Sequence, residues 1–320
     1  MTFNHAKYIT DTVNGFCMQK TDFPFVSCIF DDASTDGEPE VIRKYVEEKF
    51  EIPMITEETD DYNLVLARHK SNANCYFIVL YLKHNHYSIK KDKNAYVKKW
   101  IDGADYLALC EGDDYWTDPL KLQKQVDFLE GNPEYSLTFH NAIEHWEDDS
   151  AEDRQFSNIE DKDYSGTDIF SHWVIPTASA VLRKDVYTSK KYIDLCKKND
   201  TPIGDNLVWI SASYLGKLRG MAFCASVYRR HTNSVTLDSG YFNHIIYQYK
   251  YWCFLDEPFK SIAADRFFEG FPQMVILCRK DRNQLKTFLK YGTEISPSRA
   301  FQSLISYCIK SLFCKKRNSD

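Results

Sequence analysis

Apolar and polar positions alternate in blocks along the first part of the chain. Residues 5–20 and 39–50 carry the pattern of helices, and Pro39 lies near a first turn, where a missing N–H costs nothing. The apolar run 23–30 predicts a buried strand, and residues 53–56 predict a short one. This succession of helices and strands predicts an α/β fold with a mainly parallel sheet flanked by helices.

The later segments extend this pattern and end in a helical tail. The basic stretch 83–99 predicts a solvated helix or loop, and the acidic stretch 144–163 predicts an exposed loop. The chain from about 241 to 313 is aromatic-rich and mainly helical, so we expect an α/β region over 1–235 and a helical region over 236–320. Further helices or buried segments are predicted at 76–82 (strand or helix), 106–110, 118–129, 135–139, 174–182, 205–215 and 221–230.

Composition narrows the class of protein. The net charge of −6 over 320 residues argues against nucleic acid as the main partner. No run approaches the roughly 18 apolar residues of a membrane span, and residues 1–5 lack the basic-then-apolar pattern of a signal peptide. The ten cysteines form no CxxC pair, which favours free, reduced and mostly buried thiols in a cytoplasmic protein.

A compact acidic motif follows the apolar run 106–110. Glu111, Asp113 and Asp114 fall within four residues, and carboxylates are so costly to bury unpaired that we expect them at the exit of the strand. Gly112 allows the backbone to turn sharply there. Carboxylates suit Mg²⁺ or Mn²⁺ that also holds phosphate oxygens. The alternative is an acidic turn before the next helix.

A second acidic group follows the strand at 23–30. Asp31 and Asp32 lie where open α/β sheets bind ligands, and such side chains can accept hydrogen bonds from a ribose hydroxyl or a base N–H. The alternative is a polar turn in which Ser34 or Asp36 caps the next helix.

Three further groups each have a functional and a structural interpretation. Asp205 precedes an apolar helix and suits either a helix cap or a general base. Arg229, Arg230 and His231 follow the last strand and suit either a diphosphate or a basic surface turn. The pair at 140–141 could likewise contact an acceptor sugar or be a satisfied structural pair.

Together these segments resemble the family 2 glycosyltransferases of the GT-A fold, most of all the bacterial enzymes that assemble surface polysaccharides. The resemblance covers about residues 1–235 and depends on the order and spacing of its pieces. It implies a Rossmann-like GT-A domain that transfers a hexosyl unit from a nucleotide-diphosphate sugar to a saccharide or lipid-linked saccharide acceptor, with inversion. The matching pieces are residues 2–5, 31–37, 111–122, 204–205 and 228–231.

The resemblance also implies a role for each matching residue. Asp113 and Asp114 match the DXD-type site for Mn²⁺ or Mg²⁺, and Asp205 matches the catalytic base. The residues implied in binding the nucleotide-sugar are Phe3, Asp31, Asp32, Glu111, Asp113, Arg229, Arg230 and His231.

The chain departs from the family pattern in two places, and two rival functions remain. The strand expected before Thr2 is absent, and residues 57–100 lack the usual Asn-Gly-Gly stretch, with Arg68 as the only candidate for its Arg. One rival is a non-catalytic, degenerate transferase that binds a sugar or acts as a scaffold. The other is a sugar nucleotidyltransferase, although no Gly-rich basic phosphate loop is found near the start.

The end of the chain predicts an amphipathic helix. Apolar residues from Phe301 to Phe313 recur at three- and four-residue steps, with lysines and Arg317 beside or after them. Such a helix could lie on the anionic inner face of a membrane, which would make the protein cytoplasmic but peripherally bound there. The alternative is a helix packed on the catalytic domain.

Overall fold

The computed structural model describes residues 1–199, 204–231, 240–278 and 281–305. The chain divides into two compact units. The first unit comprises residues 1–166, 173–189 and 210–231, and the second comprises 167–172, 190–209 and 232–320. Segments 167–172 and 190–209, which lie within the predicted α/β region 1–235, therefore group with the helical C-terminal part.

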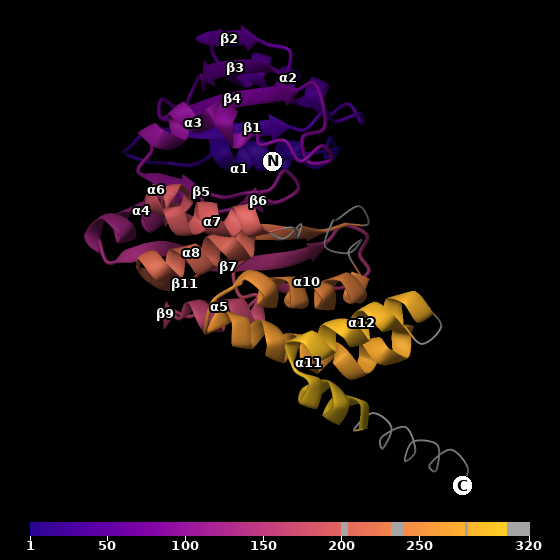
Figure 1. Ribbon diagram of the computed structural model, residues 1–320. Coiled ribbons are helices and arrows are strands. Elements are labelled where there is room, and N and C mark those ends of the chain that lie inside the picture. The colour runs from indigo at the N-terminus through magenta and orange to yellow at the C-terminus, as the bar shows by residue number, and fades with distance from the viewer. Residues whose placement is uncertain (200–203, 232–239, 279–280, 306–320) are drawn as a thin grey trace. The chain divides into compact units, whose positions relative to one another are not determined.

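The first unit is an α/β structure with two mixed sheets (Figure 1). Its strands are β1 (Phe25–Asp31), β2 (Ile55–Glu58), β3 (Tyr62–Arg68), β4 (Cys75–Leu82), β5 (Tyr106–Ala108), β6 (Tyr115–Trp116), β7 (Tyr135–Trp146), β8 (Arg154–Gln155), β9 (Asp163–Tyr164), β10 (Val181–Arg183) and β11 (Lys217–Arg230). Its helices are α1 (Ile9–Cys17), α2 (Glu38–Lys49), α3 (Asn94–Gly103), α4 (Lys121–Gly131), the short 3₁₀ helix η1 (Thr177–Ser179) and α6 (Lys184–Thr188).

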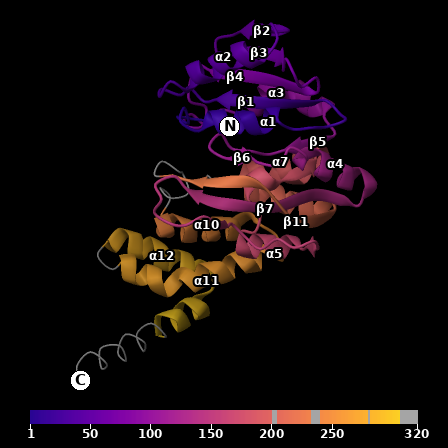
Figure 2. The same cartoon turned by 180° about the vertical axis from the view of Figure 1, so that it is seen from behind.

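The four-stranded sheet has the order β1-β4-β3-β2, and its strands lie side by side in both views (Figures 1 and 2). β4 is apolar along nearly its whole length and buried on both faces, which resolves the ambiguous segment 76–82 as a central strand. β1 and β4 are parallel, whereas β3 runs antiparallel to both its neighbours. Only a short turn joins β2 to β3, and a connection of that length forces antiparallel pairing.

The seven-stranded sheet has the order β5-β10-β7-β11-β6, with β8 on β7 and β9 on β11. Among its described pairs, only β7 and β11 are parallel. The prediction of a mainly parallel sheet is therefore wrong in detail, although the α/β class is confirmed. The acidic stretch 144–163 is also not simply a loop, because Glu144 is buried in β7 between Arg154 and Arg230, which neutralise its charge.

Residues 1 and 2 lie beside the end of β1. The Thr2 N–H donates to Phe30 O at 2.9 Å, and the Asp32 N–H donates to Thr2 O at 3.0 Å. On the other side, the Gly112 N–H donates to Met1 O at 3.0 Å. A Cβ at position 112 would collide with the Thr2 side chain, so glycine is required for this close approach. Thr2 thus takes the position expected for the end of an opening strand.

Helix α4 buries a lysine beneath the seven-stranded sheet. The Lys121 side chain is fully buried, its Nζ donates to Gln125 Oε1 at 2.9 Å and it lies 4.3 Å from the centre of the Trp116 ring. Burial lowers the pKa of Lys121 to about 7. Neither partner carries a charge that would offset the loss of hydration.

This lysine should make the first unit more stable as pH rises above neutrality. Between the folded pKa of about 7 and the ordinary value of 10.5, the unfolded chain binds a proton that the folded chain lacks, so the free energy of unfolding increases with pH. The Lys121 contribution should amount to about 2 kcal/mol between about pH 7 and about pH 9.

Urea unfolding of the unmodified chain and of Lys121→Met across that range measures the effect. The difference between the two pH profiles isolates Lys121 from other groups that titrate in the same range. Parallel profiles would show that the lysine does not change its protonation on unfolding.

The described part of the second unit is helical, including the described residues from 240 onward, where the sequence predicts helices. Its helices are α5 (Gly166–His172), α7 (Lys190–Lys198), α8 (Asp205–Leu215, which continues into the first unit), α10 (Gly240–Phe254), α11 (Phe259–Leu277) and α12 (Arg282–Ile295). Phe267, Phe271 and Phe288 are fully buried in its core. Within the described ranges, no helix is both long and apolar enough to cross a bilayer. Most of the predicted amphipathic tail lies in 306–320, outside the described residues.

The described cysteines form no disulfide and are less buried than predicted. Eight of the ten lie in the described residues, and none of these eight is disulfide-bonded. Cys75 and Cys278 are buried, three are half-buried, and Cys196, Cys224 and Cys253 are exposed. The prediction failed for the exposed three because hydrophobic composition alone does not fix which face of an element a side chain occupies.

Candidate functional site

Three potential metal ligands converge in the first unit. His5 lies before α1, Asp113 lies between β5 and β6, and His231 directly follows β11. Their ligand atoms all lie within 4.8 Å of one another, with His231 Nε2 at 2.9 Å and His5 Nε2 at 3.9 Å from Asp113 Oδ2. Two of the three, Asp113 and His231, were predicted site residues, whereas the part played by His5 was missed.

The turn after β1 holds the segment that carries His5. The buried Glu38 carboxylate accepts hydrogen bonds from the His5 N–H at 2.9 Å and the Ser34 hydroxyl at 2.8 Å. Thr2 also donates to Glu38, and Asn4 adopts a left-handed conformation with φ 57°. These contacts fix the backbone on both sides of His5. The position of its ring is therefore set by Glu38, in the first turn of α2.

The protonation states at this site suit metal binding. Burial opposes ionisation of Asp113, but the hydrogen bond with His231 and the electrostatic influence of His5 outweigh it, so the pKa of Asp113 lies below its usual value. Burial lowers the pKa of His5. An ionised carboxylate and a neutral imidazole are the forms that bind metals.

Aromatic and carbonyl contacts position the other two ligands. The His231 ring is buried and lies 4.9 Å from the Tyr8 ring and 5.7 Å from the His5 ring, measured between centroids. The backbone carbonyl of Asp113 accepts a hydrogen bond from Arg229 Nε at 2.7 Å. The strand end that supplies His231 therefore also holds the loop that supplies Asp113.

Asp114 is not part of this group. Its side chain is buried, and Oδ1 accepts the Arg229 backbone N–H at 2.9 Å. Burial and the neighbouring charges of Asp113 and Glu111 raise its pKa well above the usual value. The three-ligand group does not include Asp114, but among the described residues its buried Oδ2 has no hydrogen-bond partner, so the metal role of Asp114 stays a prediction.

The two predicted arginines are already engaged with protein carboxylates. Arg229 is buried, bonds to Asp11 at 2.8 Å and to Glu147, and lies between the rings of Tyr8 and Tyr115. Arg230 bonds to Glu144 at 2.6 Å. Both arginines thus act in the structure as supports of β7 and β11.

The acidic pair after β1 is also engaged. Asp32 is fully buried, and its two oxygens accept the backbone N–H groups of His86 at 2.6 Å and Tyr87 at 3.0 Å. Asp31 Oδ1 accepts the Ser34 N–H at 3.3 Å, and burial raises the pKa of Asp31 to about 6. Phe3, by contrast, has an exposed side chain.

Other predicted residues occupy helix or strand ends. Asp205 starts α8 in the second unit, and its Oδ1 accepts the Asn206 N–H at 2.8 Å. Glu111 is exposed at the start of the acidic loop. Asn141 donates to two backbone carbonyls, which favours the structural interpretation for that residue. His140 Nδ1 lies 2.8 Å from Asn141 O, but among the described residues its buried Nε2 has no hydrogen-bond partner.

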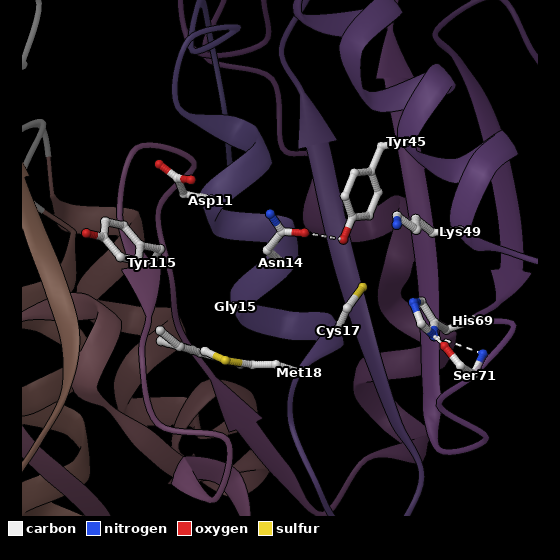
Figure 3. Close-up of a pocket in the computed structure, with 11 residues that line it drawn as sticks. Asp11, Asn14, Gly15, Cys17, Met18, Tyr45, Lys49, His69, Ser71 and Tyr115 are labelled. Atoms are coloured by element: carbon white, nitrogen blue, oxygen red, sulfur yellow. Dashed lines mark hydrogen bonds between the residues drawn. The ribbon is translucent and has the colours of Figure 1, made fainter.

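A separate pocket of about 490 Å³ lies along α1 in the first unit (Figure 3). Asp11 and Asn14 line it from α1, Tyr45 and Lys49 from α2, and Tyr115 from β6. The Tyr45 hydroxyl donates to Asn14 Oδ1 at 2.8 Å across the pocket. None of the three potential metal ligands lines it, so this pocket is distinct from the metal-ligand group.

Comparison with known proteins adds distant relatives without an assigned activity. No family model matches the chain. Over 236 residues it is 31% identical to an uncharacterized protein of Mycobacterium tuberculosis (strain ATCC 25618 / H37Rv) and to one of Mycobacterium bovis (strain ATCC BAA-935 / AF2122/97). The match covers 73% of this chain but 58% of each relative, so the chain spans little more than half the length of those proteins.

Proposed function

We propose that the protein is a metal-dependent glycosyltransferase of the GT-A type, which moves a sugar from a nucleotide-diphosphate donor to a saccharide or lipid-linked saccharide acceptor. The observation that carries this proposal is the convergence of His5, Asp113 and His231, whose donor atoms lie within 4.8 Å of one another. Asp113 belongs to the acidic motif that suggested a metal–diphosphate site. The α/β fold is compatible with this chemistry.

The residues present fit a divalent cation. Two imidazole nitrogens and one carboxylate oxygen form a common donor set, and two of their separations, 2.9 and 3.9 Å, match ligands that share one ion. When bound, such a cation supplies positive charge next to the diphosphate of the leaving group. This charge matters more here because Arg229 and Arg230 are already paired with carboxylates.

Asp205 is our proposed general base. It would take a proton from the acceptor hydroxyl, which then attacks the anomeric carbon from the face opposite the diphosphate and inverts its configuration. Its N-terminal position on α8 also suits a cap, and one carboxylate can serve both purposes.

Asp205→Asn is expected to lower kcat for sugar transfer by about 10²–10⁴-fold, because general base catalysis typically contributes that much. Release of nucleoside diphosphate from a panel of nucleotide-sugars, with Mn²⁺ and oligosaccharide acceptors, measures the rate. Asp168→Asn is the matched control, since Asp168 also lies in the first turn of a helix of the second unit. Full activity in Asp205→Asn would remove the residue from the mechanism.

A non-catalytic sugar-binding or scaffold protein is the second candidate. The contacts of Asp32 favour this candidate. Both of its carboxylate oxygens accept hydrogen bonds from backbone amides, so neither is left without a partner for a nucleotide to contact. Calorimetry in which UDP is added to protein already saturated with Mn²⁺ separates the two functions. A transferase should bind UDP, whereas a degenerate scaffold should show no heat of UDP binding.

A further inference from the structure

We propose that His5 is a direct metal ligand, so that the centre is a two-histidine, one-carboxylate site that selects a first-row transition-metal ion such as Mn²⁺ over Mg²⁺. The inference rests on the proposed function only in assuming a divalent cation at this site. It adds a ligand that the acidic motif did not predict, and it names the class of ion.

The separations of the three side chains fit a shared ion. Metal–nitrogen and metal–oxygen bonds of about 2.1 Å place two ligand atoms about 3–4.2 Å apart. The distances from Asp113 Oδ2 to His231 Nε2 and to His5 Nε2, 2.9 and 3.9 Å, lie close to or within that range. Since no pair of ligand atoms exceeds 4.8 Å, a shift of less than about 1 Å would let all three bind one ion.

The surroundings of His5 present one defined nitrogen. His5 Nδ1 lies 3.2 Å from the Thr2 hydroxyl, and Thr2 itself donates to the buried Glu38. Outer partners of this kind fix the ring orientation of metal-binding histidines. The opposite nitrogen, Nε2, is the atom directed at Asp113, so the ring is held in a position suited to ligation.

The donor set discriminates between ions. Mg²⁺ prefers oxygen ligands and retains its waters, whereas imidazole suits the transition metals. Two of the three ligands here are imidazoles. Asp114 would have made the site richer in oxygen, but it is not among the residues whose donor atoms lie within 4.8 Å of one another, and its Oδ1 accepts the Arg229 amide. The site should therefore bind Mn²⁺ much more tightly than Mg²⁺.

Metal titration of the full chain without any nucleotide-sugar tests the inference. Isothermal calorimetry with Mn²⁺ and with Mg²⁺, and the loss of the free Mn²⁺ resonance in electron paramagnetic spectra, give the affinities. We expect Mg²⁺ to bind at least about 10²-fold more weakly, and His5→Ala to weaken Mn²⁺ binding by about 10–10²-fold. His84→Ala, which alters an exposed histidine, should leave Mn²⁺ affinity unchanged.

Thermal unfolding in a chelator shows whether His5→Ala still folds, and His5→Gln provides a second variant that retains polarity and bulk. Equal affinity for the two ions, or unchanged Mn²⁺ affinity in a folded His5 variant, would overturn the inference. A failure of the proposed function can be distinguished from a failure of the metal site. Selective Mn²⁺ binding through His5 without sugar transfer from any donor would support the metal site and reject the transferase.

Discussion

Asp113→Asn should nearly abolish sugar transfer, lowering kcat/KM by about 10³-fold or more. Asp113 is the carboxylate shared by His5 and His231, and the amide that replaces it has no negative charge and is a poor ligand for a divalent cation. Because both nearby arginines are paired with other carboxylates, no free guanidinium among them can substitute for the lost cation.

Steady-state assays of sugar transfer with Mn²⁺ measure the loss of activity. Calorimetry with Mn²⁺ on the same sample measures the loss of cation binding. The variant should remain folded, since Asn preserves the size of the side chain and the Arg229 contact is made by the backbone carbonyl of residue 113. Asp127→Asn, on the exposed face of α4, is the control. Retained transfer in Asp113→Asn would exclude the acidic motif from catalysis.

Arg229→Met should destabilise the first unit by about 3 kcal/mol, because it removes the charge-assisted hydrogen bonds of a buried guanidinium. The guanidinium is 6% exposed and bonds to Asp11, Glu147 and the Asp113 carbonyl. Met fills the same space between the Tyr8 and Tyr115 rings. The loss of stability therefore measures mainly the polar contacts of the guanidinium.

Urea unfolding near neutral pH measures the change in the free energy of unfolding. Arg219→Met on the same strand is the matched control. Arg219 pairs with the exposed Asp163 at 3.3 Å, and a surface pair of that kind contributes less than about 1 kcal/mol. If the two substitutions lower the free energy of unfolding equally, the contacts of Arg229 do not stabilise the site.

Much of the fold could be predicted from apolar runs. The runs in β1, β4 and β11 stand out because these strands are buried on one or both faces, and α2 is marked by its polar face and Pro39. The sequence did not predict β3. It also did not predict the mixed orientation of the two sheets, because the direction of a strand depends on the strand with which it pairs. Lys121 escaped notice since a lysine in an amphipathic helix is normally assigned to the solvated face.

Those parts of the candidate site that depend on the type of a side chain could be predicted from the sequence. The parts that depend on contacts of the backbone could not. Asp113 and His231 follow strands, so their proximity could be anticipated from the α/β pattern. His5 is held through its backbone amide by Glu38, and Asp32 is enclosed by the amides of residues 86 and 87. Such contacts involve groups that every residue carries, and the sequence therefore gives no signal for them.

The three potential ligands come from the beginning, the middle and the end of the first unit. They can meet only once both sheets have formed, and the unfolded chain offers no comparable set of donors. An ion held there would act as a non-covalent cross-link between distant parts of the chain. Occupancy and folding are then thermodynamically linked, and free cation at about 100 times its dissociation constant would add about 2.7 kcal/mol to the stability of the folded state. A cation bound there would thus raise the stability of the first unit as well as serve the proposed transfer reaction.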